Sequence, residues 1–241
     1  MDIKILGSGS SGNCYRVGDG VSSLLLDAGL PFKKIQHGLD FKVSELSGVL
    51  VTHEHGDHSK AVKDLLAFGI DCFMSEGTAV GAGISNRTEI FPGKTILVSH
   101  TSILPCLHII EARLSFDIGT FTILPFHVQH DAAEPLGFLV RSTHTGETLL
   151  YATDTCYLKY RFAGLTHIIL EVNYCRDLLD ENVAAGLLDQ TLRNRIISNH
   201  LALQTALEFF RANDLSRVQQ IILVHLSNNN AHAEKILREV Q

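Results

Sequence analysis

The sequence has few cysteines, and none are paired at metal-binding spacing. Its 241 residues contain five, an odd number, at scattered positions without a Cys-x-x-Cys pair: Cys14, Cys72, Cys106, Cys156 and Cys175. This argues against both a disulfide framework and a thiolate zinc site. We therefore expect the cysteines to be small buried apolar residues.

Long apolar runs and an excess of basic residues are also absent. The longest apolar runs, such as residues 221–224, are too short to span a bilayer, and residues 1–4 do not resemble the start of a signal peptide. We expect a soluble, cytoplasmic protein with no membrane partner. The net charge of −6 argues against a broadly basic nucleic-acid-binding face. The net charge does not exclude a local basic patch, or positive charge supplied by bound metal ions.

The pattern of apolar residues predicts one domain over residues 1–241, since 45% of the residues are hydrophobic and no low-complexity linker divides the chain. Short apolar runs predict strands at 3–6, 14–17, 23–27, 49–52, 116–118, 121–126, 136–141, 148–151, 167–170 and 218–224. Helical spacing predicts helices at 59–68, 181–195, 201–212 and 231–240. Two groups of strands with helices indicate an α/β fold: two β-sheets packed face to face, with helices on both outer faces.

Residues 53–58 concentrate metal-ligand chemistry in one loop. The segment His53-Glu54-His55-Gly56-Asp57-His58 follows a strand-like run and holds three imidazoles and an aspartate. Zinc, manganese and iron all accept imidazole nitrogen and carboxylate oxygen. A chain with this histidine content contains the pattern H-x-H-x-D-H by chance about 0.002 times. The segment therefore predicts a metal site.

Further ligands are expected at the carboxyl ends of other predicted strands. His130 follows the strand at 121–126, Asp154 follows that at 148–151, and His225 follows that at 218–224. His127 competes with His130 for this role, but only His130 precedes the Asp-Ala of residues 131–132. We interpret His127 as a strand residue.

The order of these residues resembles the metallo-β-lactamase superfold, in which H-x-H-x-D-H is followed by His, Asp and His. The resemblance implies an αββα sandwich that binds two divalent metal ions, zinc or manganese or iron. It implies that one metal is held by His53, His55 and His130, a second by Asp57, His58 and His225, and that Asp154 bridges both. Asp57 counts among the catalytic residues as well. Two metals that share a carboxylate lie about 3.5–4 Å apart and activate a water molecule between them.

Longer strings resemble the YycJ/WalJ branch of this superfold over essentially the whole chain. They are LGSGSSGNC at 6–14, LDAGL at 26–30, HDA at 130–132, PLGF at 135–138, YATDT at 151–155 and HLSNNN at 225–230. The resemblance implies a metal-dependent phosphodiesterase related to tRNA 3′-processing ribonucleases, with 5′-to-3′ DNA exonuclease activity. DNA or RNA would then be the substrate.

His200 matches a histidine that related nucleases use to protonate the leaving oxygen. Glu171, at the end of a predicted strand, is our candidate for the carboxylate that orients it. The chain departs from the branch at 199–203, where Asn-His-Leu-Ala-Leu replaces Gly-His-Leu-Ser-Asn, and at 171–175, where Glu-Val-Asn-Tyr-Cys replaces Leu-Glu-x-Asn-His-Asp. These changes bear on the substrate more than on the chemistry.

Other polar residues have plainer interpretations. Asp27 is expected to brace the metal loop rather than to bind metal, and the Gly-Ser run at 7–12 is expected to be a hairpin turn, because it lacks the Lys-Ser/Thr ending of a P-loop. Five cations are equally consistent with a nucleic-acid path or with scattered solvated charges: Lys159, Arg161, Arg176, Arg193 and Arg195. Six histidines are expected at the surface or in satisfied positions: His37, His100, His108, His144, His167 and His232.

Two alternative functions remain open from the sequence. The same site could serve a small or cyclic phosphodiester, since the chain is acidic and adds no nucleic-acid-binding module. Thioester, lactone and β-lactam hydrolases share the first motif, but they do not share the HDA and HLS contexts. The sequence leaves the oligomeric state open.

Overall fold

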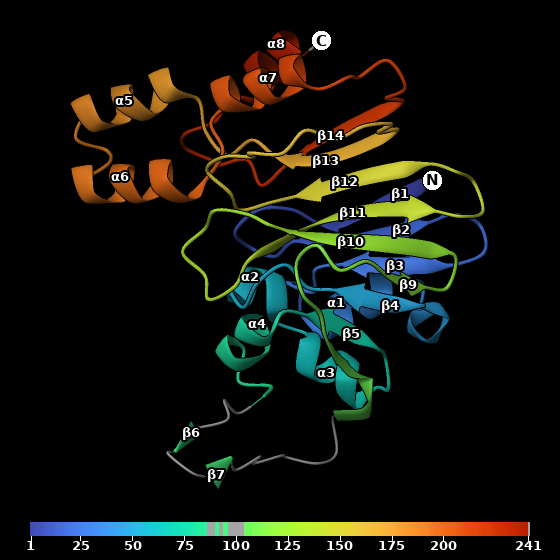
Figure 1. The fold of residues 1–241 in the computed structure, drawn as a ribbon. Coiled ribbons are helices and arrows are strands. Elements are labelled where there is room, and N and C mark those ends of the chain that lie inside the picture. The colour runs from blue at the N-terminus through green and yellow to red at the C-terminus, as the bar shows by residue number, and fades with distance from the viewer. Residues whose placement is uncertain (86–89, 92–93, 96–103, 241) are drawn as a thin grey trace.

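The computed structural model describes residues 1–85, 90–91, 94–95 and 104–240. Two six-stranded sheets stack on each other (Figure 1), with strand orders β1-β2-β3-β4-β5-β8 and β14-β13-β12-β11-β10-β9. The first sheet consists of β1 (Asp2–Gly7), β2 (Cys14–Gly18), β3 (Ser23–Leu26), β4 (Gly48–Leu50), β5 (Cys72–Met74) and β8 (Leu107–Ile109). The second consists of β9 (Phe116–Ile118), β10 (Phe121–His127), β11 (Leu136–Ser142), β12 (Thr148–Ala152), β13 (His167–Glu171) and β14 (Gln220–Val224). A small separate ribbon pairs β6 (Ile90–Phe91) with β7 (Lys94–Thr95).

Alternation along the strands divides the apolar residues among three layers. In β3, Leu24 and Leu26 point between the sheets, whereas Leu25 points to the outer face. In β12, Tyr151 lies in the core between the sheets and Leu150 in the layer under the outer helices. Because successive side chains of a strand point to opposite faces, strands that are apolar throughout become buried on both sides.

Helices cover both outer faces of the sandwich. Beside the first sheet lie α1 (Phe32–Gly38), α2 (Gly56–Ser59), α3 (Val62–Ala67) and α4 (Glu76–Gly81), with 3-10 turns η1 (Val43–Glu45) and η2 (Leu104–Cys106). Beside the second lie α5 (Arg176–Ala184), α6 (Gln190–Asn199), α7 (Leu203–Ala212) and α8 (Ala233–Val240). Figure 1 shows α7 and α8 over this sheet and α5 and α6 projecting to one side as a helical hairpin. The predicted α/β sandwich is confirmed.

Two predicted helices are wrong in their extent. The helix expected at 59–68 is the shorter α3, and α2 ends before it at Ser59. Between them the backbone N–H of Ala61 bonds to the carbonyl of Ala28 at 2.9 Å instead of continuing a helix. The helix expected at 181–195 is broken between α5 and α6. Gly186 turns the chain with a left-handed φ of 70°, and the Asp189 side chain caps α6 by accepting from the N–H groups of Thr191 and Leu192 at 2.8 and 2.9 Å.

His200 lies between two helices. It follows the last residue of α6 with an extended backbone, φ −128° and ψ 154°, and α7 begins three residues later at Leu203. The sequence patterns missed α1, α4 and all of β5 to β8. These four strands have two or three residues each, too few to display an alternating pattern.

The described residues contain no helix long and apolar enough to cross a membrane. The cysteines form no disulfide within this part of the chain. Cys14, Cys72 and Cys175 are buried, as expected, whereas Cys106 and Cys156 are partly exposed.

Candidate metal centre

The carboxyl ends of the strands place the predicted ligands along one edge of the sandwich. β12, β13 and β14 are parallel neighbours, so the residues that follow them share an edge. Asp154 and His225 lie just beyond β12 and β14, and both have left-handed backbones with φ of 47° and 56°. Such a conformation is uncommon for non-glycine residues and clusters at functional sites. It turns each side chain towards the loop that follows β4.

His53, His55 and His130 form the first group of candidate ligands, with one nitrogen from each within 4.8 Å of the others. The Nδ1 atom of His55 lies 3.1 Å from Nε2 of His53 and 3.1 Å from Nε2 of His130. Burial lowers the pKa of both His53 and His130. Neutral imidazoles with converging nitrogens are suitable donors for a divalent cation.

Asp57, His58, Asp154 and His225 form the second group, again with donor atoms within 4.8 Å. Nε2 of His58 lies 3.2 Å from Oδ1 of Asp154, and Nε2 of His225 lies 3.6 Å from Oδ2 of Asp57. That His225 nitrogen is buried and has no hydrogen-bond partner among the described residues. A buried, unpartnered nitrogen that faces carboxylates fits a metal ligand.

Protons are the competitors of a metal in this second group. Burial lowers the pKa of His225, but the Asp57 and Glu171 carboxylates outweigh it and raise the pKa to about 10. Burial likewise opposes the charged form of His58, yet Asp154 and Asp27 raise its pKa well above the ordinary value. Metal binding here must therefore release protons.

Asp154 lies between the two groups. Its Oδ1 is 3.2 Å from Nε2 of His58 and 3.5 Å from Nδ1 of His225. Its Oδ2 is 3.7 Å from Nε2 of His130. Burial raises the pKa of Asp154, but the neighbouring His58 and His225 lower it by more than burial raises it. The carboxylate therefore stays ionised. The position suits the bridging role that the sequence predicts.

Glu171 supports two histidines with a single oxygen. Its Oε1 lies 2.7 Å from Nδ1 of His200 and 2.8 Å from Nδ1 of His225. Its Oε2 accepts from the backbone N–H groups of Leu201 and Thr155 at 3.0 and 3.1 Å. The sequence suggested the contact with His200, and the structure adds the contact with His225. Burial lowers the pKa of His200, but Glu171 raises it more.

Asp27 lies behind the metal loop, where the sequence predicts a brace. Its Oδ2 is 2.8 Å from Nδ1 of His58, and its Oδ1 accepts from the backbone N–H of Thr52 at 2.8 Å. The hydroxyl of Tyr151 also donates to this carboxylate. Asp27 therefore contacts the His58 nitrogen that faces away from Asp154.

Asn13 is a site residue that the sequence patterns missed. The Gly-Ser run is the predicted turn between β1 and β2, and fully buried Asn13 ties it to the metal loop. The Asn13 backbone N–H donates to the carbonyl of Asp57 at 2.7 Å, and its amide nitrogen lies 3.0 Å from Nε2 of His58. In the sequence, the only local indication of this role was an amide side chain between Gly12 and Cys14.

Other predicted positions lie apart from the centre. His127 ends β10 with an exposed side chain, as interpreted. His37, His144 and His232 are exposed, His108 pairs with Asp71 at 2.8 Å, and His167 contacts Thr166 at 2.9 Å. His100 lies outside the described residues.

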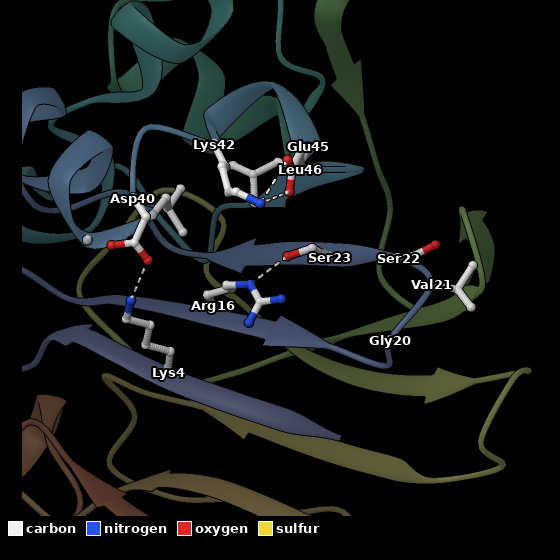
Figure 2. Close-up of a pocket in the computed structure, with 12 residues that line it drawn as sticks. Lys4, Arg16, Gly20, Val21, Ser22, Ser23, Asp40, Lys42, Glu45 and Leu46 are labelled. Carbon is white, nitrogen blue, oxygen red and sulfur yellow. Dashed lines mark hydrogen bonds and ion pairs between the residues drawn. The ribbon is translucent and has the colours of Figure 1, made fainter.

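A cavity of about 230 Å³ opens onto the centre. Its lining comes from both ligand groups, the end of α6 and His200. A larger cavity of about 670 Å³ lies on the outer face of the first sheet and contains none of the candidate ligands (Figure 2). Its cations are paired with carboxylates, for example Lys4 with Asp40 at 3.3 Å and Lys42 with Glu45 at 3.3 Å. The candidate ligands therefore face the smaller cavity.

Comparisons with known proteins agree with this geometry. A family model described as "Beta-lactamase superfamily domain" matches residues 23–226. Exodeoxyribonuclease WalJ of Streptococcus pneumoniae serotype 2 (strain D39 / NCTC 7466) is 31% identical over 94% of this chain and 82% of its own length. Exodeoxyribonuclease YycJ of Bacillus anthracis is 27% identical over 95% and 84%.

Among solved structures, the metallo-β-lactamase fold protein YhfI from Bacillus subtilis superposes with a TM-score of 0.67. It is 16% identical, and the alignment covers 98% of this chain and 90% of YhfI. At this identity the likeness concerns the fold alone. Together with the family match and the relatives, it confirms the predicted resemblance: the chain belongs to the metallo-β-lactamase superfamily.

Proposed function

We propose that this protein is a two-metal phosphodiesterase that degrades DNA from its 5′ end. The observation that carries the proposal is the convergence of donor groups at one edge of the sandwich. Asp154 belongs to the group with Asp57, His58 and His225, and its Oδ2 faces His130 of the group with His53 and His55. The exodeoxyribonuclease names of relatives that match over most of both chains support the substrate.

The residues fit two divalent cations. His53, His55 and His130 would hold one, Asp57, His58 and His225 the other, and Asp154 would contact both. When bound, two divalent cations supply Lewis acidity and lower the pKa of water towards neutrality. Two M²⁺ ions carry +4 against −2 from Asp57 and Asp154, so the loaded pocket attracts an anionic ester although the chain is acidic. Nitrogen and oxygen donors suit zinc, manganese or iron, and metal analysis identifies which is bound.

His200 is our candidate for the proton donor to the leaving oxygen. Glu171 contacts its Nδ1 atom, so Nε2 is the nitrogen left to exchange a proton with substrate. The raised pKa of His200 favours the protonated form that an acid requires. Its side chain keeps 20% exposure at the cavity, which leaves it accessible to a bound ester.

The test uses metal-loaded protein with three substrates: 5′-labelled duplex DNA, an aryl phosphodiester and a β-lactam. We expect cleavage of the DNA from its 5′ end and of the aryl diester, and none of the β-lactam. His200→Ala should lower turnover of DNA about 10²–10⁴-fold with bound metal unchanged, because a general acid contributes on this scale.

His127→Ala provides the matched control, since His127 is an exposed histidine outside both ligand groups. Loss of metal in His200→Ala would move His200 into the ligand set. Hydrolysis of the β-lactam without any phosphodiester cleavage would contradict the proposal.

A small or cyclic phosphodiester is the second candidate, and the modest cavity of about 230 Å³ favours it. In that case the same assays would show efficient cleavage of small diesters and no processive shortening of DNA.

A further inference from the structure

One face of α6 forms a wall of the site cavity. The cavity lining includes four residues of this helix, at the i, i+3, i+4 and i+7 spacing that places side chains on one face: Leu192, Arg195, Ile196 and Asn199. Leu192 is apolar and yet 44% exposed. The Arg195 side chain is 66% exposed. The wall thus combines an accessible cation with accessible apolar surface.

The structure holds this wall in a defined position relative to the candidate ligands. The backbone carbonyl of Asn199, the last residue of α6, lies 3.0 Å from Nδ1 of His130. At the other side of the hairpin, Arg193 binds Asp180 of α5 through Nη2 at 2.6 Å and Nε at 2.8 Å. Any group bound to α6 therefore lies at a set distance from the metal centre.

Arg195 differs from the other cations that the sequence pointed to. Lys159 and Arg161 lie beside α7, and Arg176 begins α5. Neither these three nor Arg193 lines the site cavity. Of the five cations that the sequence grouped together, Arg195 lines the site cavity and the other four do not.

The ion pair of Arg195 is weak enough to exchange. Its Nε and Nη2 atoms both lie 3.3 Å from the same oxygen of Asp131. Charge-assisted hydrogen bonds are usually about 2.7–2.9 Å long, and the contacts of the Arg193 pair are shorter than those of Arg195, at 2.6 and 2.8 Å. An exposed pair contributes about 0–1 kcal/mol. A phosphate can accept both N–H groups of the guanidinium on separate oxygens, which Asp131 does not do here.

We propose that α6 binds the nucleotide next to the scissile phosphodiester, with Arg195 on its phosphate and Leu192 and Ile196 against its sugar or base. This inference rests on the proposed phosphodiesterase function and deepens it. A small diester has no second phosphate, so a contact between Arg195 and the neighbouring phosphate would favour polynucleotides over small diesters.

The experiment compares wild type, Arg195→Gln, Arg195→Lys and Arg211→Gln in the metal-loaded protein. Arg211→Gln is the matched control, because Arg211 is an exposed cation of α7 outside the cavity. One measurement is the affinity for a labelled single-stranded phosphorothioate oligonucleotide, by fluorescence anisotropy over a range of salt. The other is hydrolysis of an aryl phosphodiester by the same preparations.

We expect Arg195→Gln to weaken oligonucleotide binding about tenfold, which is the scale of one lost charge-assisted contact. Its salt dependence should become shallower by about 0.7 in log–log slope, the value for one phosphate of a single strand. Arg195→Lys should bind with intermediate affinity but with the salt dependence of wild type, because it keeps the charge and loses the second N–H contact. Arg211→Gln should bind like wild type, and all four should hydrolyse the aryl diester equally.

Unchanged binding by Arg195→Gln would overturn the inference. So would a loss of aryl diester hydrolysis that matches the loss of binding, because it would indicate a structural role. A wild-type protein that cleaves no phosphodiester would instead refute the proposed function, while weaker oligonucleotide binding by Arg195→Gln alone would still support the site on α6.

Discussion

Glu171 is the residue on which the candidate acid and a candidate ligand both depend. Its buried carboxylate contacts His200 and His225 through one oxygen, and two backbone N–H groups hold the other oxygen in place. A carboxylate behind a ligating imidazole sets its orientation and basicity. The exchange of Glu171 for glutamine keeps the shape and removes the charge.

We expect Glu171→Gln to lower both metal affinity and turnover. Metal affinity at the second group should fall about 10–100-fold, as for other changes behind a metal ligand. Turnover should fall further, because the pKa of His200 loses its main support. Chelator titration and initial rates measure the two effects separately. Wild-type metal affinity with reduced turnover would confine Glu171 to the His200 contact.

At the scale of elements, the turn between β2 and β3 links the two sheets through Asp19. One oxygen of this buried carboxylate accepts from the backbone N–H groups of Val21 and Ser22. The other accepts from Thr120 and Ser142 of the second sheet, each at 2.6 Å. Burial raises the pKa of Asp19, but these hydrogen bonds lower it more, and it lies below its ordinary value.

We expect Asp19→Asn to lower the free energy of unfolding at neutral pH by about 1–3 kcal/mol. The asparagine amide has one acceptor oxygen in place of two, so it cannot accept from both the backbone N–H groups and the hydroxyls of Thr120 and Ser142. Because the folded-state pKa is depressed, the stabilisation from ionised Asp19 is present above the unfolded pKa of about 4 and is lost as the pH falls below it. Urea denaturation at neutral and acidic pH should therefore show the variant and wild type converging in acid. A difference independent of pH would exclude the charge as its cause.

At the scale of the whole molecule, the metal centre joins loops from both sheets. Its ligands follow β4 in the first sheet and β10, β12 and β14 in the second. Ions that bind only the folded chain stabilise all of these connections at once.

We expect two equivalents of a divalent metal to bind and to raise the melting temperature. At a free metal concentration about 100 times Kd each site contributes about 2.7 kcal/mol, or roughly 5–10 °C per site for a chain of this size. Because the pKa values of His58 and His225 are raised, protons compete with the metal, and the shift should be larger at about pH 8 than at about pH 6. Calorimetry with and without chelator measures it. Identical melting in both would contradict metal binding at this site.

The sequence by itself determined the layered fold and the residues expected to bind metal, because both follow from local patterns. Apolar runs mark strands, and ligand-type residues such as His53, Asp154 and His225 stand directly after those runs. Strand ends in a layered sheet meet at one edge, so their convergence could be predicted.

The sequence predicts Asp27 and the Glu171–His200 pair as supports of the site, but only the tertiary structure decided the other supporting contacts. Glu171 contacts His225 across 54 positions of sequence, and Asn13 contacts His58 across 45. Arg193 and Arg195, two residues apart on a helix, point about 200° apart, but which of them faces the cavity depends on how α6 packs beside the site. Contacts of this kind depend on how elements pack, and no local pattern records that packing.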